Sequence, residues 1–222
     1  MRQFSRTLSR NIARRCALMG GAAALLLSAA IIAPLRAATL PDAVIPDQLG
    51  VQLKGGNANV ENLDEIVKVG FTAVRRGFIW AAMETQPGVY DFSAYDPLVK
   101  ECEARHLKII AAMAFANKLY GPAYEPKGRA AYAKWAAALA AHYKGAPIYF
   151  EIWNEPNTRT FWGNQGRGSH GTGNTEAYAE EYTALVKATV PAMKAADPHC
   201  TVLAGAVSGL WSGSFTWMQD CF

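Results

Sequence analysis

One segment of the sequence places an indole, an amide and a carboxylate side by side where a strand should end. Residues 150–157 read Phe-Glu-Ile-Trp-Asn-Glu-Pro-Asn. The apolar first half predicts a strand, and the proline ends it, so Asn154 and Glu155 should stand at its carboxyl end. A carboxylic acid close to Trp153, with limited access to water, has a raised pKa and can act as a general acid.

A second group of polar and aromatic residues lies upstream. Arg75 precedes Trp80 by five residues, and the stretch 84–92 reads Glu-Thr-Gln-Pro-Gly-Val-Tyr-Asp-Phe. An arginine next to a carboxylate lowers the pKa of that carboxylate, so Arg75 is a candidate for keeping an acidic group ionised. Arg75 also has a structural alternative, an ion pair with Glu151, which shares strand parity with Glu155.

The elements that must position these residues alternate between strand and helix. The pattern predicts strands over 49–54, 71–79, 107–115, 148–154 and 201–207. Helices are predicted over 60–69, 95–105, 129–143 and 176–196, the last breaking or restarting near Pro191, and Trp217–Phe222 looks like the opening of another. Gly70 stands at a helix C-terminal cap position. Repeated βα units indicate a parallel sheet, either doubly wound or closed as a barrel.

Both motifs together resemble the retaining glycoside hydrolases of clan A. The sequence Trp-Asn-Glu-Pro at the end of a fourth strand, with Arg-x-x-x-x-Trp and Glu-x-x-Pro-Gly-x-Tyr-Asp-Phe on the second, is most similar to family 39, with families 5 and 42 as neighbours. The resemblance implies an α/β fold, the (β/α)8 TIM barrel, over 39–222. A complete barrel takes about 250 residues, so this chain should hold about five of the eight units and be truncated at its C-terminus.

The resemblance also implies roles for individual residues. Glu155 would be the general acid/base, Asn154 would hydrogen-bond the sugar 2-hydroxyl, and Arg75 would hold the nucleophile carboxylate ionised. Trp80 and the other two aromatic candidates, Trp153 and Trp162, would offer stacking faces to sugars.

Further site assignments leave alternatives open. Asn117, after the third strand, would touch substrate, although a loop asparagine commonly only forms a turn. The three tryptophans can equally be core or rim, Asn154 can merely shape the turn, and Glu155 can cap a helix. A nucleophile glutamate would come from a seventh strand beyond Phe222, and Glu84 is a weaker substitute.

Composition and charge narrow the function classes. The net charge of +4 comes from six arginines within residues 1–38, a stretch without acids, so the rest of the chain carries 16 basic against 18 acidic residues. That balance argues against nucleic-acid binding. The arginines, the apolar run 16–35 and the small residues before Thr39 predict a signal peptide over 1–38, with a secreted or periplasmic protein and no membrane contact after cleavage. An uncleaved anchor is the alternative.

Cysteines and histidines predict no metal site. Removal of the signal leaves Cys102, Cys200 and Cys221, an odd number that implies a free thiol, an intermolecular bridge or a missing partner. The sequence 166–171 fits Gly-x-Gly-x-x-Gly but does not directly follow a strand, so a dinucleotide site is disfavoured.

Three functions therefore compete. We expect an exported β-glycosidase acting on poly- or oligosaccharides without a cofactor. The alternatives are a non-catalytic carbohydrate-binding or degenerate protein of the same fold and a nucleotide-dependent oxidoreductase. The carbohydrate substrate is the one partner expected, and the sequence does not specify an oligomeric state.

Overall fold

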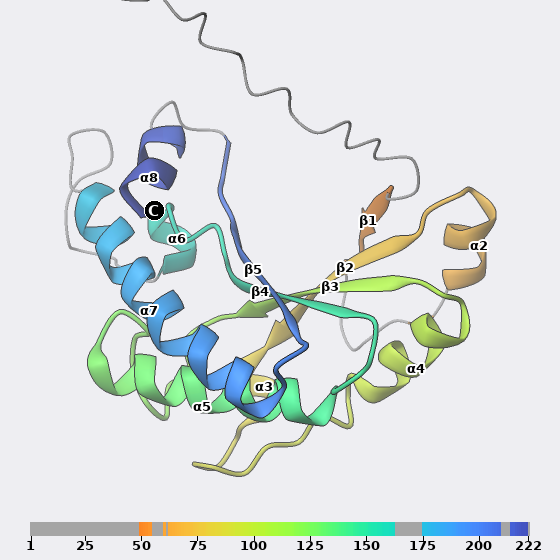
Figure 1. Cartoon of the computed structure of the whole chain (residues 1–222), viewed down its shortest axis with the longest axis horizontal. Helices are drawn as coiled ribbons and strands as arrows, with labels where there is room; N and C mark the ends of the chain where they lie inside the picture. Colours follow the sequence, from red (N-terminus) through yellow and green to blue (C-terminus); the bar gives the residue numbers. More distant parts are fainter. Residues whose placement is uncertain (1–48, 55–59, 61, 163–174, 210–213, 222) are drawn as a thin grey trace, which may run out of the picture. The chain divides into compact units, whose positions relative to one another are not determined.

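The structure is a computed structural model that describes residues 49–54, 60, 62–162, 175–209 and 214–221 (Figure 1). Strands and helices alternate along it, as predicted. The strands are β1 (Gly50–Gln52), β2 (Ala73–Ile79), β3 (Lys108–Ala114), β4 (Ile148–Asn154) and β5 (Thr201–Ala206). The helices are α2 (Leu63–Lys68), α3 (Trp80–Met83), α4 (Asp96–Ala104), α5 (Pro126–His142), α6 (Arg159–Trp162), α7 (Thr175–Ala196) and α8 (Ser214–Cys221).

The five strands form one parallel sheet in the order β1-β2-β3-β4-β5. Each strand lies beside the strand that precedes it in sequence, so these units show no reversal of strand order. A reversal is the mark of a doubly wound sheet, whereas sequential order is that of a (β/α)8 barrel wall. The arrangement therefore confirms the predicted α/β class as five consecutive units of an incomplete barrel.

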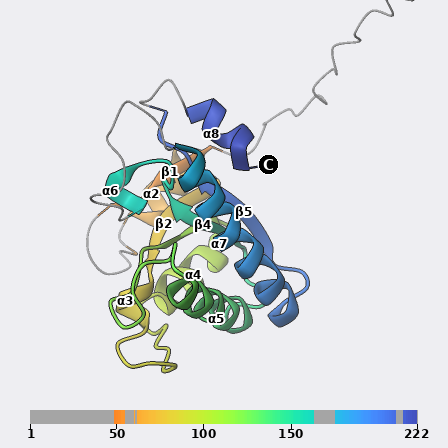
Figure 2. The same ribbon diagram turned by 90° about the vertical axis from the view of Figure 1, so that its left-hand side faces the viewer.

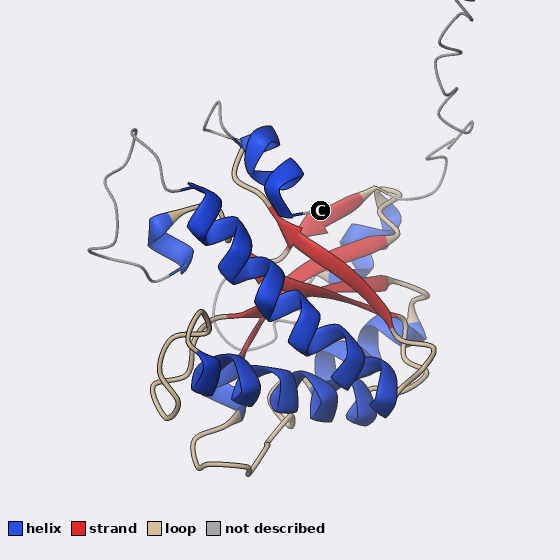
Figure 3. Ribbon diagram, turned by 60° about the vertical axis from the view of Figure 1, so that its left-hand side comes forward, coloured by secondary structure: helices blue, strands red, loops and turns tan. Residues whose placement is uncertain are grey.

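The helices α5 and α7 pack against each other and cover one face of the sheet (Figures 2 and 3). Alternate strand residues such as Phe78, Ile109, Phe150 and Ile152 are fully or almost fully buried and join the hydrophobic core. The period of two along each strand explains this pattern, since every second side chain points to the same face.

The opposite face of the sheet carries the polar residues of the motifs. Arg75 alternates with the fully buried Val74 and is half-buried, and Ile110 beside it in register is also half-buried. Gln52 and Glu151 share this face, because Gln52 pairs in register with Arg75 and Glu151 lies one position from the buried Phe150. We call this the polar face.

Apart from β4, the predicted boundaries differ from the structure by up to three residues, and the short helices α3 and α6 were not predicted. The expected break near Pro191 is wrong, because α7 runs continuously through that residue. Pro191 is exposed, so water can reach the backbone carbonyl that loses its hydrogen-bond donor. Helix α5 begins at Pro126 rather than Arg129, since proline suits the first turn of a helix. Gly70 has a φ of 93°, as its predicted capping role requires.

Within the described residues, no helix is long and apolar enough to cross a membrane. The predicted signal peptide over 1–38 and the glycine-rich stretch 166–171 lie outside the described residues. The cysteines Cys102, Cys200 and Cys221 are all buried and free.

Candidate active site

Strand β4 ends in an unusual backbone that turns Glu155 away from the line of the strand. Trp153 has a φ of 70° and Glu155 a φ of 48°, both in the left-handed region that side chains other than glycine rarely adopt. Each such residue costs about 1–3 kcal/mol and persists only where its surroundings enforce it. The Glu155 N–H donates to Ala206 O at 2.8 Å, and its carbonyl accepts from both N and Oγ1 of Thr158 at 3.0 Å.

A tyrosine of α7 joins β4 to β5 just before this turn. The Tyr182 hydroxyl donates to Ile152 O at 3.0 Å and accepts from Gly205 N at 2.5 Å. A Cβ at Gly205 would lie 2.3 Å from Ile152 O, so only glycine fits there. Burial raises the pKa of Tyr182 above its ordinary value, which keeps the donating proton in place. Sequence reasoning missed Tyr182, because it is an ordinary residue of an amphipathic helix.

The structure brings Arg75 together with Asn154 on the polar face. The Arg75 Nη2 donates to Asn154 Oδ1 at 2.9 Å. Because arginine has only donors, this contact fixes which end of the amide is the oxygen. The Asn154 Nδ2 has no hydrogen-bond partner among the described residues, so it is free to donate to a ligand hydroxyl.

The alternative pairing of Arg75 with Glu151 is also present. The Glu151 Oε2 accepts from Arg75 Nε at 2.7 Å and lies 2.6 Å from Nη2. The Glu151 side chain is 8% exposed and that of Arg75 24%. Burial raises the pKa of Glu151 above its ordinary value, while the Arg75 charge and hydrogen bond act to lower it. Arg75 thus already has an anionic partner on β4, in addition to any nucleophile it would serve.

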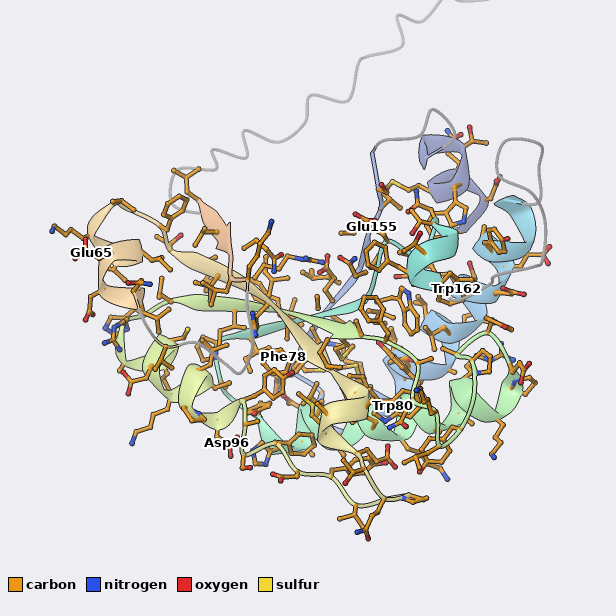
Figure 4. All side chains as sticks on the ribbon, turned by 180° about the vertical axis from the view of Figure 1, so that it is seen from behind. Glu65, Phe78, Trp80, Asp96, Glu155 and Trp162 are labelled. Carbon is orange, nitrogen blue, oxygen red and sulfur yellow. The ribbon has the colours of Figure 1, made fainter. Side chains whose placement is uncertain are left out.

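Glu155 stands beside α6 at the end of β4 (Figure 4). Its side chain is half-buried and forms no hydrogen bond or ion pair within the described part of the chain. A carboxylate that is accessible yet unpaired can exchange a proton with a ligand, which is what general acid/base catalysis requires.

The three predicted sugar-stacking tryptophans are buried instead, which contradicts that expectation. Trp80 is 0% exposed, Trp153 1% and Trp162 2%. Trp80 opens α3 and stacks on Trp135 of α5 at a centroid distance of 5.7 Å, between helix and sheet (Figure 4). Trp153 and Trp162 contact each other edge to face at 5.0 Å. Burial of these large apolar rings stabilises the core, so the rings pack inside the protein and are not available to stack on a sugar.

Glu84, which follows α3, and Asn117, which follows β3, belong to one buried polar cluster. The Glu84 carboxylate accepts from Trp80 Nε1, Tyr120 OH and Gly88 N at 2.5–2.7 Å. Asn117, 3% exposed, donates to the Glu84 carbonyl at 2.8 Å. The predicted substrate contact of Asn117 is therefore replaced by a turn-forming role. Glu84, saturated by donors and 1% exposed, is no substitute nucleophile.

The described residues contain no cluster of three or more histidine, cysteine, aspartate or glutamate side chains that could hold a metal ion. At the end of β4 the structure places the Glu155 carboxylate and the Asn154 amide, with the Arg75 guanidinium donating to that amide.

Solved structures share this fold. A family 39 glycoside hydrolase from the gut symbiont Bacteroides cellulosilyticus superposes with a TM-score of 0.56 at 20% identity, covering 71% of this chain and 31% of that one. A beta-galactosidase from the psychrophilic Marinomonas ef1 gives 0.56 at 14% identity, covering 78% and 39%. An endoglucanase from the hyperthermophilic Thermotoga maritima gives 0.51 at 18% identity, covering 69% and 46%.

Sequence comparison agrees with the fold. A beta-xylosidase from Geobacillus stearothermophilus is 37% identical over 71 residues, which are 32% of this chain and 11% of that protein. The chain thus spans less than half the length of these relatives. The family model described as cellulase (glycosyl hydrolase family 5) matches residues 48–220. This confirms the predicted resemblance to clan A glycoside hydrolases, with family 5 as the matching model where the motifs were most similar to family 39. The chain belongs to the cellulase family, glycosyl hydrolase family 5.

Proposed function

We propose that the protein is a retaining glycosidase that cleaves β-glycosidic bonds of poly- or oligosaccharides, with Glu155 as general acid/base. The observation that carries the proposal is an unpaired, accessible Glu155 directly after Asn154, whose amide Arg75 orients. Membership of a glycoside hydrolase family supports the reaction class. The names of the relatives point to different sugars, so the proposal stops at the β-linkage.

In the first step Glu155 would protonate the leaving-group oxygen while a carboxylate attacks the anomeric carbon. In the second, Glu155 would take a proton from the water that hydrolyses the glycosyl-enzyme intermediate. The Asn154 Nδ2 would donate to the sugar 2-hydroxyl, a contact that strengthens as positive charge develops on the ring.

A retaining mechanism needs a second carboxylate about 5–5.5 Å from the first. Among the described residues, Glu84 is enclosed by donors and Glu151 is committed to Arg75. We therefore propose that the nucleophile belongs to a later strand of the barrel, outside the five described. We also propose export, on the basis of the arginines and the apolar run before Thr39.

A second candidate function is carbohydrate binding without hydrolysis. The observation that favours it is the same lack of a suitable second carboxylate among the described residues. In that case the polar face would bind a sugar through Asn154, and Glu155 would transfer no proton.

The test is hydrolysis of aryl β-glycosides by the protein as its gene encodes it, compared with Glu155→Gln. We expect the variant to lose about 10²–10⁴-fold in turnover on a glycoside with a poor leaving group. The first step on a dinitrophenyl glycoside should be nearly unaffected, because that leaving group needs no proton. The matched control is Glu103→Gln, an exposed carboxylate in the last turn of α4, at the opposite end of the strands.

The stereochemistry of the product gives an independent check. Proton NMR during hydrolysis should show the β-anomer first, since two displacements retain configuration. Saturable sugar binding without turnover, unchanged in Glu155→Gln, would support the second candidate instead. Equal losses for both leaving groups would show that Glu155 is not the acid.

A further inference from the structure

Three hydrogen bonds give Gln52, the last residue of the edge strand β1, an unusual arrangement for an exposed side chain. Its Oε1 accepts from Arg75 Nη1 at 2.7 Å, while its Nε2 donates to the Arg75 carbonyl at 3.0 Å and to Leu53 O at 3.1 Å. One amide therefore binds both the side chain and the backbone of the same residue. Strand register explains this, because Gln52 and Arg75 are paired neighbours on β1 and β2.

The guanidinium of Arg75 is held at two edges. Glu151 accepts along the edge formed by Nε and Nη2, and Gln52 accepts at Nη1 on the other side. Glu151 receives both of its contacts on a single oxygen, and Asn154 accepts from Nη2 as well. Gln52 is the acceptor at Nη1, so its hydrogen bond adds a third group that holds the rigid planar guanidinium in place.

The plane of Arg75 matters because Nη2 also serves Asn154. The 2.9 Å bond from Nη2 to Asn154 Oδ1 holds the amide oxygen at Arg75 and leaves Nδ2 without a partner among the described residues. A rotation of the guanidinium that lengthened this bond would free the amide to flip and present its oxygen to a ligand. A sugar hydroxyl would then face the donating Nδ2 of Asn154 in some molecules and the accepting Oδ1 in others.

We propose that Gln52 is a positioning residue, which fixes the Arg75 guanidinium so that Asn154 presents its amide nitrogen to the sugar. Its part in hydrolysis rests on the function proposed above, while its hydrogen-bond role does not. Gln52 acts from β1 through Arg75 on β2 to Asn154 on β4, a span of three strand spacings or about 14 Å along the sheet. Neither the edge position nor the exposure of Gln52 indicates this role without the contacts to Arg75.

The first experiment measures Arg75 directly by NMR in the full chain. The Arg75 Nε–H signal is assigned by its absence in Arg75→Lys. We expect Gln52→Met, which keeps the side-chain length and removes all three hydrogen bonds, to shift this signal and to speed exchange of the guanidinium protons at least about fivefold. Gln52→Glu, which keeps an acceptor, should retain protection. The matched control is Gln219→Met, an exposed glutamine of α8.

The second experiment is a double-mutant cycle with Asn154→Ala, measured as kcat/KM on an aryl β-glycoside. Gln52→Met should lose about tenfold in the native background, as expected for a hydrogen bond to a charged group, and less than about twofold when Asn154 is already alanine. A merely structural role would give equal losses in both backgrounds.

The outcomes separate the two proposals. An Arg75 signal unchanged in Gln52→Met overturns the positioning role, whatever the activity. Equal losses of kcat/KM for Gln52→Met in the native and the Asn154→Ala backgrounds overturn the claim that Gln52 acts through Asn154. A protein that hydrolyses no β-glycoside refutes the proposed function, while a shifted and less protected Arg75 signal still supports the fixing of the guanidinium by Gln52.

Discussion

Tyr182 should be the most costly single hydroxyl to remove near the end of β4. It is buried on α7 and serves two backbone groups, Ile152 O and Gly205 N, on neighbouring strands. Phenylalanine keeps the ring and removes the oxygen, so packing is preserved while both groups lose this partner. A buried group left without a hydrogen bond costs about 1–3 kcal/mol. We therefore expect Tyr182→Phe to lower the free energy of unfolding by about 2–4 kcal/mol.

The assay is urea unfolding followed by tryptophan fluorescence, with thermal unfolding alongside. For a domain of this size each kcal/mol shifts Tm by about 2–4 °C, so the midpoint should fall by about 5–15 °C. The control is Tyr149→Phe, because the half-buried Tyr149 hydroxyl has no hydrogen bond within the described residues. That control should change stability by less than about 0.5 kcal/mol. An equally small loss for Tyr182→Phe would refute the idea that its hydroxyl links β4 to β5.

The remaining predictions concern the polar cluster, a close backbone contact and a thiol. Glu84→Gln should lower the free energy of unfolding by about 1–3 kcal/mol in urea, because the new amide donor faces groups that also donate. Burial, followed by the Glu84 charge, raises the pKa of Tyr90 to about 12, so Glu84→Gln should lower it in an NMR titration. Because the unfolded chain releases the Tyr90 hydroxyl proton at a lower pH than the folded one, the free energy of unfolding of the wild type should fall as pH rises from about 10 toward 12. A free energy of unfolding that does not change over that range would contradict this. Gly128→Ala should cost about 2–3 kcal/mol on thermal unfolding, because its Cβ would lie 2.1 Å from Pro122 O. Burial raises the pKa of the Cys102 thiol to about 11, so alkylation at pH 8 should be slow and should speed up in urea; rapid labelling of folded protein would be inconsistent with this.

Local patterns in the sequence predicted the five strands and the longer helices of the fold, but not the short helices α3 and α6. Strand β4 was predicted at 148–154 and is observed over Ile148–Asn154, because an apolar run ending at a proline is a strongly local signal. The alternation of strands and helices likewise predicted a parallel sheet. The end of β4 was identified as the place for Glu155 because strand ends are set by residues close in sequence.

Contacts between distant residues were decided only in three dimensions. The motifs suggested that Trp80, Trp153 and Trp162 stack on sugars, but the structure buries all three. Burial of a large apolar ring is favourable regardless of the motif to which the residue belongs. Helix α7 continues through Pro191 because its exposed side lets water satisfy the freed carbonyl, which no local pattern reports.

What the sequence determined by itself is the chemistry at the end of β4, an acid next to an amide, together with the elements that carry them. The tertiary structure decided what orients that chemistry. Gln52 and Glu151 reach Arg75 from strands on either side, and Tyr182 reaches β4 from a helix. Such contacts depend on strand register and on which face a helix turns to the sheet. These are properties of the folded chain, and the spacing of residues along the sequence does not encode them locally.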